Sequence, residues 1–428
     1  MPLLAAALAW LLFLLAAPFL LFHPRTRRGW RSRLGLYRAD PVTQAGPRVW
    51  LHGASAGDVL GLVPIVRELK ALRPDARVII SAMTDSGAAM AHQRLLKTGL
   101  CDAVTFVPWD LRGPCERAMA ALRPDVFVVE YTELWPQLLS AASRAGAKLV
   151  LTNGRIGPRY VRRYRALFFL VGNLLQMFAL LLMRGEDEAE RALLLGARKE
   201  TLFVTGNTKF DALAVSVPES VGKGPPTPDA QLAEALACAG ERLWVCGSTH
   251  DGEEGPLLDV YVKLRADFPG LRLLLAPRYV ERAKTVLAMA RERGLAARLR
   301  SQPGGAEAVI VLDTIGELVR AYTLATVVFV GGSFGSRGGQ NILEPAACAK
   351  PVLFGPRMEN FIDSVQVLVG RGGLQVASPR ALEKLMRDLL ARPDELSKLG
   401  QMAREATAAV RGASVRDAQL IAGLLGAR

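Results

Sequence analysis

Hydrophobic residues along the chain follow two alternating patterns. Short apolar runs such as Val49–Leu51 predict buried strands, and most stretches between them carry apolar residues at helical spacing. Strands that alternate with helices predict parallel sheets with helices on both faces. We expect strands at residues 48–52, 77–82, 103–108, 126–130, 148–153, 178–184, 201–205, 243–247, 271–277, 308–312, 326–330, 351–354 and 374–376.

These strands are too many for one sheet, and a segment rich in proline and glycine, VSVPESVGKGPPTPDAQ, separates two series of them. The predicted fold class is therefore α/β, with two doubly wound Rossmann-like domains. We expect the first domain at 24–215, a linker at 216–230 and the second domain at 231–428, with packing of its last helix back on the first domain left open. Ligands of such sheets bind beyond the carboxyl ends of the strands, which predicts a site in a cleft between facing domains.

The N-terminus predicts a membrane anchor. Residues 1–22 carry no side-chain charge, are nearly all apolar and have about the length that spans a bilayer core. A cluster of arginines follows directly, whereas a secretory signal places its positive charges before the apolar run. We therefore interpret residues 1–23 as an anchor helix, with the rest of the chain on the cytoplasmic side. A cleaved signal peptide is the alternative.

A second uncharged run covers residues 166–183 and is interrupted by Gly172, Asn173 and Gln176. It predicts a core helix followed by a buried strand. Periodicity alone leaves shallow membrane contact as an alternative.

Charge and composition narrow the partners. The net charge of +14 favours anionic partners. No aromatic-rich basic module typical of nucleic-acid binding is present, so lipid or phosphate is the better prediction. The five cysteines lie far apart and form no C-x-x-C pair. This spacing indicates a reduced compartment without structural zinc or a disulfide framework.

The sequence HGASAGD places Asp58 where a predicted strand meets a predicted helix. A carboxylate in the first turn of a helix often caps it. The same position at a strand's carboxyl end also suits a general base. Both interpretations of Asp58 remain open on this stretch alone.

Two further motifs in the first half carry polar residues beyond strands. VEYTELWPQLL places Glu130, Glu133 and Trp135 at a strand end, which indicates either sugar recognition or a helix start with acids in its first turn. GNTKFD places Lys209 in a loop near the domain junction. This lysine either neutralises charge on a leaving group or is simply solvated.

In the second half, GGSFGSRGGQNILEPAA follows a strand and opens a helix near Asn341. Glycines let backbone amides approach a phosphate closely, but Asn341 and Glu344 also match a capping box. As an alternative to capping the helix, the Glu344 carboxylate is a candidate for binding the two hydroxyls of a ribose. Pro277 and Arg278 follow another strand, where an arginine suits a phosphate or carboxylate, and Gly316 lies at the turn into a helix. His250 has acids nearby, but one histidine does not make a metal site.

Eight short motifs, taken in their order along the chain, resemble those of one family, the 3-deoxy-D-manno-octulosonic acid (Kdo) transferases. The motifs are HGASAGD, TELWP, NGRIG, GNTKFD, GSTHDGEE, PRYVER, DTIGEL and GGSFGSRGGQNILEPAA. The resemblance implies an inverting, metal-independent glycosyltransferase of the two-domain GT-B type that needs no cofactor. It implies transfer of Kdo from CMP-Kdo to a lipid A precursor similar to lipid IVA, in lipopolysaccharide biosynthesis at the bacterial inner membrane, with anionic lipids and no nucleic acid as partners.

The resemblance also assigns residues. It implies Asp58 as general base, Lys209 as the residue that stabilises the transition state, and Glu130 as a third catalytic candidate. The implied nucleotide site comprises Pro277, Arg278, Ile315, Gly316, Glu317, Asn341, Ile342, Leu343 and Glu344.

Three positions depart from the family pattern. Asp58 stands where the family has a glutamate, so the carboxylate is one methylene shorter, and Tyr279 stands where histidine is common. The first glutamate of E-T-E-L-W-P aligns with Tyr131, and Glu130 comes one position earlier. Neighbouring strand positions point to opposite faces, so only a local bulge would let Glu130 substitute. The alternatives are a transferase that uses another CMP- or UDP-sugar, or a non-catalytic homologue that binds lipid A.

Overall fold

The computed structural model describes residues 13, 28–37, 42–214, 229–236, 240–305 and 307–426. The chain forms two compact units, residues 1–212 together with 411–428 (unit 1) and residues 213–410 (unit 2). Residues 411–428, whose last helix the sequence left open to packing on the first domain, belong to unit 1. Most of the predicted linker lies outside the described residues.

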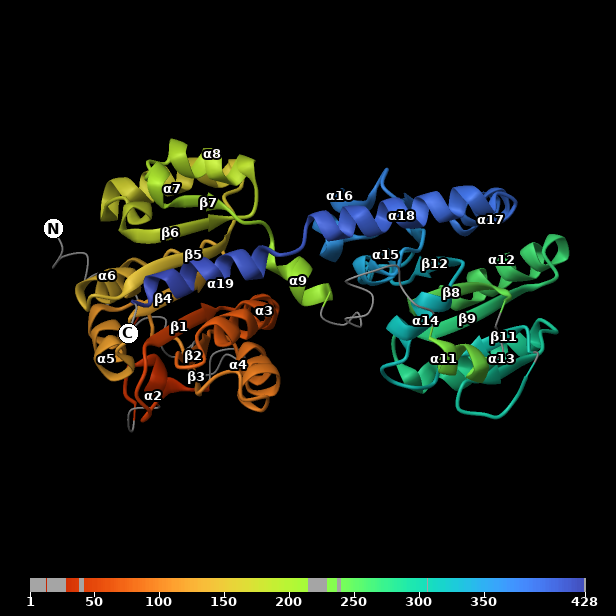
Figure 1. The fold of residues 1–428 in the computed structure, drawn as a ribbon, viewed down its shortest axis with the longest axis horizontal. Coiled ribbons are helices and arrows are strands. Elements are labelled where there is room, and N and C mark those ends of the chain that lie inside the picture. The colour runs from red at the N-terminus through yellow and green to blue at the C-terminus, as the bar shows by residue number, and fades with distance from the viewer. Residues whose placement is uncertain are drawn as a thin grey trace. The chain divides into compact units, whose positions relative to one another are not determined.

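Unit 1 is built on a seven-stranded parallel sheet with the order β3-β2-β1-β4-β5-β6-β7, and helices lie on both of its faces (Figure 1). Its strands are β1 (Arg48–Gly53), β2 (Arg77–Ala82), β3 (Ala103–Phe106), β4 (Val126–Glu130), β5 (Lys148–Gly154), β6 (Phe178–Met183) and β7 (Leu202–Val204). Its helices are α2 (Trp30–Arg33), α3 (Ala56–Leu72), α4 (Asp85–Ala91), η1 (His92–Leu96), α5 (Arg112–Leu122), α6 (Pro136–Arg144), η2 (Pro158–Tyr160), α7 (Val161–Val171), η3 (Leu174–Met177), α8 (Glu186–Leu194), η4 (Lys199–Thr201), α9 (Thr208–Ala214), which runs on into unit 2, and α19 (Ala413–Leu424).

Unit 2 has a second seven-stranded parallel sheet, with the order β10-β11-β9-β8-β12-β13-β14. Its strands are β8 (Arg242–Thr249), β9 (Leu271–Pro277), β10 (Ala297–Leu299), β11 (Val309–Val311), β12 (Val327–Val330), β13 (Val352–Phe354) and β14 (Gly373–Gln375). Its helices are α11 (Ala230–Ala235), α12 (Glu254–Asp267), η5 (Val280–Arg282), α13 (Ala283–Glu292), α14 (Leu318–Leu324), α15 (Leu343–Ala347), η6 (Glu359–Phe361), α16 (Ile362–Leu368), α17 (Pro379–Leu390) and α18 (Pro393–Ala409). The predicted α/β class with two doubly wound parallel sheets is confirmed.

Strand alternation explains how the sheet of unit 1 is buried on both faces. Along β1, Val49 and Leu51 pack against α3, whereas Trp50 belongs to the apolar cluster on the opposite face. The rings of Trp50 and Phe127 lie 4.6 Å apart between centroids, and Trp50 Nε1 donates to Ser81 Oγ at 2.7 Å. Because both faces are covered, the central strands read as continuous apolar runs, which is why they could be predicted.

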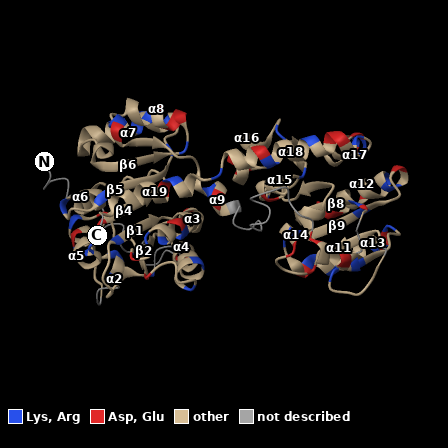
Figure 2. Ribbon diagram, in the orientation of Figure 1, with Lys and Arg blue, Asp and Glu red and all other residues tan. Residues whose placement is uncertain are grey.

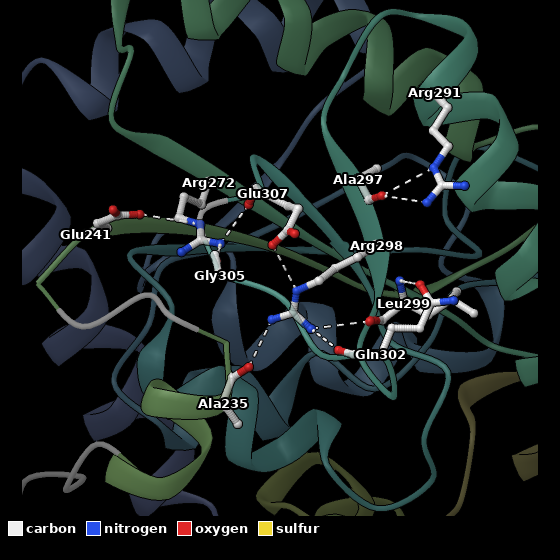
Figure 3. Close-up of polar contacts among 10 residues, drawn as sticks. All are labelled: Ala235, Glu241, Arg272, Arg291, Ala297, Arg298, Leu299, Gln302, Gly305 and Glu307. Carbon is white, nitrogen blue, oxygen red and sulfur yellow. Dashed lines mark hydrogen bonds and ion pairs between the residues drawn. The ribbon is translucent and has the colours of Figure 1, made fainter.

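The short strand β10 was missed from the sequence because arginine is its central residue. Arg298 is 4% exposed, and its guanidinium donates to Glu307 Oε2 at 3.1 Å and to the Ala235 carbonyl at 2.9 Å (Figure 3). On β9, which is separated from β10 by β11, Arg272 donates to the Glu307 carbonyl at 2.6 Å. A buried cation is tolerated when its donors are satisfied, so an arginine can lie inside this sheet edge.

Helix α7 contradicts the predicted core helix in residues 166–183. None of its residues is buried, and Phe169 and Leu170 are 91% and 78% exposed. Val161, Tyr164, Leu167 and Phe168 are only partly buried against the core of unit 1. The six consecutive apolar residues 166–171 wrap around the helix at about 100° per residue, so only one stripe of them can face the core. The strand that follows, β6, is buried as expected.

The predicted anchor at residues 1–23 lies outside the described residues except for Phe13. Within the described part of the chain, no helix is long and apolar enough to cross a bilayer. Lysine, arginine, aspartate and glutamate are interspersed along the helices of both units (Figure 2). Counted over the sequence, the excess of lysine and arginine over aspartate and glutamate nevertheless lies almost entirely in unit 1.

Candidate active site

The strand order of each sheet reverses at one point, and the candidate residues follow the strands that meet there. In unit 1 the reversal lies between β1 and β4. Asp58 follows β1, and Glu130 ends β4. In unit 2 the reversal lies between β8 and β12. The GSTHDGEE motif begins at the end of β8, and the glycine-rich loop follows β12. Such points leave a crevice at the carboxyl ends of the strands, where α/β proteins bind ligands.

Asp58 is held in place by the start of its own helix. Its Oδ2 accepts hydrogen bonds from the Ser55 backbone N–H at 3.0 Å and from Ser55 Oγ at 2.7 Å. Its Oδ1 lies 3.4 Å from Lys209 Nζ. One oxygen therefore caps α3 while the other faces a cation. The capping and chemical interpretations of Asp58 are compatible.

Lys209 lies in the first turn of α9 and faces the Tyr131 ring as well as Asp58. Its Nζ is 4.3 Å from the centroid of the Tyr131 ring, a cation–π distance. Burial disfavours the ammonium, yet contacts with Tyr131, Asp58 and Glu130 raise the pKa of Lys209 above its ordinary value. The side chain stays 31% exposed. Lys209 is thus a charged group that a ligand can reach.

Glu130 lies behind this pair and is fully buried. Its Oε2 accepts from Thr152 Oγ1 and its Oε1 from Asn153 Nδ2, both at 2.8 Å. Burial raises the pKa of Glu130 to about 7, against the effect of these hydrogen bonds and of nearby Lys209. A Cβ on Gly61 of α3 would lie 3.0 Å from Glu130 Oε1, so the helix backbone approaches the carboxylate closely.

Tyr131 explains how two consecutive residues both reach Lys209. Strict alternation would send Glu130 and Tyr131 to opposite faces. Tyr131 instead has φ +57, in the left-handed region that bulky residues seldom adopt. The chain thus turns sharply where β4 ends, and both side chains stay close to Lys209. Residues held in this conformation cluster at functional sites.

Three residues of this site were not singled out from the sequence. Thr152 and Asn153 at the end of β5 hold Glu130, and Asn153 has φ +54 beside an irregularity in the β5–β6 register. The guanidinium of Arg184, just after β6, lies 5.9 Å from the Tyr131 ring centroid. Each follows or ends a strand of the same sheet, which is the signal that would have found it.

Glu133 and Trp135 interact with each other rather than facing outward as a pair. Trp135 Nε1 donates to Glu133 Oε2 at 2.8 Å. Burial raises the pKa of Glu133, and the bond from Trp135 opposes the shift. The acid therefore orients the indole at the start of α6.

In unit 2 a cavity of 360 Å³ lies at the carboxyl ends of β9 and β11. Five predicted nucleotide residues line it, namely Pro277, Arg278, Ile315, Asn341 and Glu344. Ser248, Thr314 and Gln340 add polar side chains to its wall. The cavity thus offers a guanidinium, an amide and a carboxylate together.

The other four predicted nucleotide residues do not line this cavity. Ile342 and Leu343 are buried in the core of unit 2, at 0% and 2% exposure. Gly316, with φ +90, makes the turn before α14. Glu317 accepts hydrogen bonds from Arg300 and Thr314, so its carboxylate is engaged within unit 2.

The glycine-rich loop differs from the expectation that its amides face a phosphate. Glu253, 2% exposed, accepts hydrogen bonds from the backbone N–H groups of Gly332, Ser333 and Phe334 at 2.7, 2.9 and 2.9 Å, and from that of His250 at 3.0 Å. A buried carboxylate already occupies the position an anion would take. These three loop amides are therefore unavailable to a ligand, and the first half of the loop has an internal anchor.

His250 lies among cations beside this loop. Burial lowers its pKa, Glu253 opposes the shift, and Arg337 and Arg278 lower the pKa further. Among the residues described, no carboxylate forms an ion pair with Arg278 or Arg337. Positive charge without a protein counter-ion favours an anionic ligand. In the described ranges, no group of three or more His, Cys, Asp or Glu side chains could hold a metal ion.

Two doubly wound parallel sheets, each with polar residues at its switch point, define a protein of the two-domain GT-B architecture. The fold resembles UDP-GlcNAc 2-epimerase from Neisseria meningitidis, with TM-score 0.57 and 13% identity over 87% of this chain and 100% of that one. A family model described as 3-deoxy-D-manno-octulosonic-acid transferase matches residues 28–212.

Two curated relatives extend this match over most of the chain. The 3-deoxy-D-manno-octulosonic acid transferase of Haemophilus influenzae is 30% identical over 407 residues, which cover 93% of this chain and 92% of the relative. The same enzyme of Bordetella pertussis is 30% identical over 400 residues, 90% of this chain and 89% of the relative. The chain belongs to the 3-deoxy-D-manno-octulosonic acid transferase family and is a glycosyltransferase, as its motifs predicted.

Proposed function

We propose that this protein transfers Kdo from CMP-Kdo to a lipid A precursor with inversion at the anomeric carbon. The observation that supports this most is the pair of Asp58 and Lys209, a partly exposed carboxylate and ammonium 3.4 Å apart at the carboxyl end of a sheet. Family membership supports Kdo as the sugar. The cavity of unit 2 supports a phosphorylated donor.

In the proposed reaction Asp58 accepts the proton of an acceptor sugar hydroxyl. The hydroxyl oxygen forms a bond to the anomeric carbon of Kdo, and the bond from that carbon to the CMP phosphate oxygen breaks on the opposite face. The positive end of α3 and the ammonium of Lys209 stabilise the carboxylate before it accepts the proton. The capping bonds from Ser55 hold it in one orientation, which favours a productive geometry.

The donor would bind unit 2, and its departing phosphate carries negative charge that needs a partner. Arg278, exposed at the cavity, supplies one. Asn341 Oδ1 accepts from the Leu343 N–H at 3.0 Å, which leaves its amide N–H donors for the ligand. Glu344 is the candidate for the ribose hydroxyls. The amides of Gly332, Ser333 and Phe334 have no part in this scheme.

The lipid acceptor and the location at the cytoplasmic face of the inner membrane are part of the same proposal. Helix α7 supports it with exposed Phe169 and Leu170 next to Arg162, Arg163 and Arg165. An apolar edge flanked by cations suits a membrane surface with anionic headgroups. The uncharged residues 1–22 support it as well.

The test is transfer by the purified full-length chain in detergent. CMP-Kdo and lipid IVA are supplied, and the acceptor product is measured by mass spectrometry. We expect Asp58→Ala to lower the rate at least about 100-fold. Asp394→Ala removes an exposed acid from the first turn of α18 and serves as the matched control. Wild-type activity in Asp58→Ala would exclude the assigned base. Lipid binding without CMP release by the wild type would favour the non-catalytic homologue.

A further inference from the structure

The chain passes between the two units twice, and both passages lie close to Lys209 in unit 1. The first follows Ala212, three residues after Lys209, and the second precedes Arg411. Helix α19 begins directly after the second passage. Residues of these two segments are separated by about two hundred positions in sequence but contact each other.

Asp211 makes that contact with both of its oxygens. Its Oδ1 accepts from the Gly412 N–H and its Oδ2 from the Ser414 N–H, both at 2.7 Å. A carboxylate from a distant segment thus caps the N-terminus of α19, where orphan amides and the helix dipole favour negative charge. Glycine at position 412 allows the left-handed conformation, φ +87, from which the helix starts.

A second contact joins the same two segments on the other side of Lys209. Arg416 of α19 donates to the Thr205 carbonyl through Nε at 3.0 Å and Nη2 at 2.6 Å. Between the two anchors, the Lys209 backbone N–H donates to Asn207 Oδ1 at 3.0 Å. The loop from Thr205 to Asp211 is therefore fastened at both ends to one helix.

Helix α19 is in turn fixed on the helix that carries Asp58. Ala418 and Ile421 of α19 share an apolar cluster with Val59 and Leu62 of α3, and the two helices lie side by side (Figure 1). Asp58 lies on α3, α3 packs against α19, and α19 is bound by Asp211, two residues after Lys209. Lys209 Nζ is in turn 3.4 Å from Asp58 Oδ1. The position of Lys209 opposite Asp58 is thus determined by α19 as well as by its own loop.

We infer that Asp211 is a positioning residue for the transfer reaction, which sets Lys209 opposite Asp58 by fastening α9 to the N-terminus of α19. The inference rests on the proposed function, because it assigns the geometry of the same site. An ordinary helix cap would contribute stability only. A positioning role predicts that loss of Asp211 lowers kcat through Lys209.

The experiment compares Asp211→Asn, Asp211→Ala, Lys209→Ala and the double variant Asp211→Ala/Lys209→Ala in the full chain. We expect the Asp211 variants to lower kcat about 10- to 100-fold, with KM for CMP-Kdo within about twofold, because a displacement of about 1 Å is costly in catalysis. In the Lys209→Ala background, Asp211→Ala should have no further effect on kcat, since residues that act as a unit are not additive. Additive losses would overturn the inference.

Ser378→Ala is the matched control, because Ser378 caps α17 in unit 2 by accepting from the Ala381 N–H at 3.2 Å. It should lower the melting temperature about as much as Asp211→Asn but leave kcat unchanged. Asp211→Asn retains one acceptor and keeps the experiment informative if Asp211→Ala does not fold. Wild-type kcat in Asp211→Asn would overturn the inference.

Amide hydrogen exchange separates this inference from the proposed function. We expect faster exchange at residues 207–210 in Asp211→Asn than in the wild type, and no change there in Ser378→Ala. If the wild type transfers no Kdo, the proposed function fails, and exchange still tests the fastening of the loop. Unchanged exchange in Asp211→Asn would contradict it.

Discussion

Lys209 Nζ lies 3.4 Å from Asp58 Oδ1, although the two residues are 151 positions apart in the chain. Each residue follows a strand of the same parallel sheet, and the carboxyl ends of parallel strands meet at one edge. Because β7 lies four strands from β1, the contact also needs the segment after β7 to carry Lys209 back toward α3. Its precise distance depends on the caps at the starts of α3 and α19, which hold the two backbones.

Stability of the protein should depend on pH through two buried acids. Burial raises the pKa of Glu130 from 4.5 to about 7 and that of Asp417 from 3.8 to about 8, with the nearby Thr205 hydroxyl opposing the shift at Asp417. The folded protein then keeps both protons to a higher pH than the unfolded chain does. The free energy of unfolding should fall as pH rises from about 4 to about 8.

Asp417→Asn tests this dependence, because the amide stays neutral throughout. We expect a shallower fall in the urea midpoint between pH 4 and pH 8 than in the wild type. Asp394→Asn, at an exposed site on α18, should retain the wild-type slope. A wild-type slope in Asp417→Asn would show that this acid does not hold its proton in the folded state.

Removal of Glu253 should loosen the glycine-rich loop. Glu253→Ala leaves the amides of Gly332, Ser333 and Phe334 buried or partly buried without their acceptor, and each bond to a charged group contributes about 1.5 to 3 kcal/mol. We expect the free energy of unfolding to fall by about 3 kcal/mol or more, measured by urea unfolding. Glu281→Ala, which removes an exposed acid of η5, is the control. Equal stability of the two variants would contradict an anchoring role.

A methyl group at Gly61 should be destabilising although it lies in a helix. Alanine normally stabilises a helix by about 1 kcal/mol relative to glycine. A Cβ at Gly61 would lie 3.0 Å from Glu130 Oε1, and Thr152 and Asn153 hold that carboxylate in place. We expect Gly61→Ala to cost about 1 to 3 kcal/mol, as overpacking does.

Gly423 of α19 supplies the matched comparison for Gly61. Its Cβ would meet nothing within 4 Å, and Gly423→Ala should stabilise the protein by up to about 1 kcal/mol. Thermal and urea unfolding of the two variants measure the difference. Stabilisation by both substitutions would show that Glu130 can move away from α3.

Ligand-induced stabilisation should identify the nucleotide of the donor. CMP at about 100 times its Kd adds about 2.7 kcal/mol to the free energy of unfolding, which is visible as a rise in melting temperature. We expect UDP to give a smaller rise, and Arg278→Ala to reduce the rise with CMP. Arg357→Ala, which removes an exposed arginine paired with Glu359, should leave it unchanged. An equal or larger rise with UDP would favour a different donor.

Much of the fold could be predicted from the sequence because central parallel strands are buried on both faces. All strands except β10 were expected, since a run such as Val126–Val129 is apolar throughout. Strand β10 was missed because Arg298 at its centre is stabilised by the Glu307 carboxylate and by backbone carbonyls, among them that of Ala235, 63 positions away in the chain. Helix α7 was assigned to the core because an apolar run does not reveal which of its residues face solvent.

The sequence by itself determined the fold class, the family and the residue types that the chemistry needs, because local patterns and motif order record them directly. Only the tertiary structure decided how those residues are used. The left-handed conformation of Tyr131 leaves both Tyr131 and Glu130 near Lys209 against strand alternation, and Glu253 accepts hydrogen bonds from amides of the glycine-rich loop that were predicted to face a phosphate. Hydrogen bonds between distant segments, such as that of Asp211 with Ser414, leave no trace in local periodicity. They exist only once the chain has folded and must satisfy its buried polar groups.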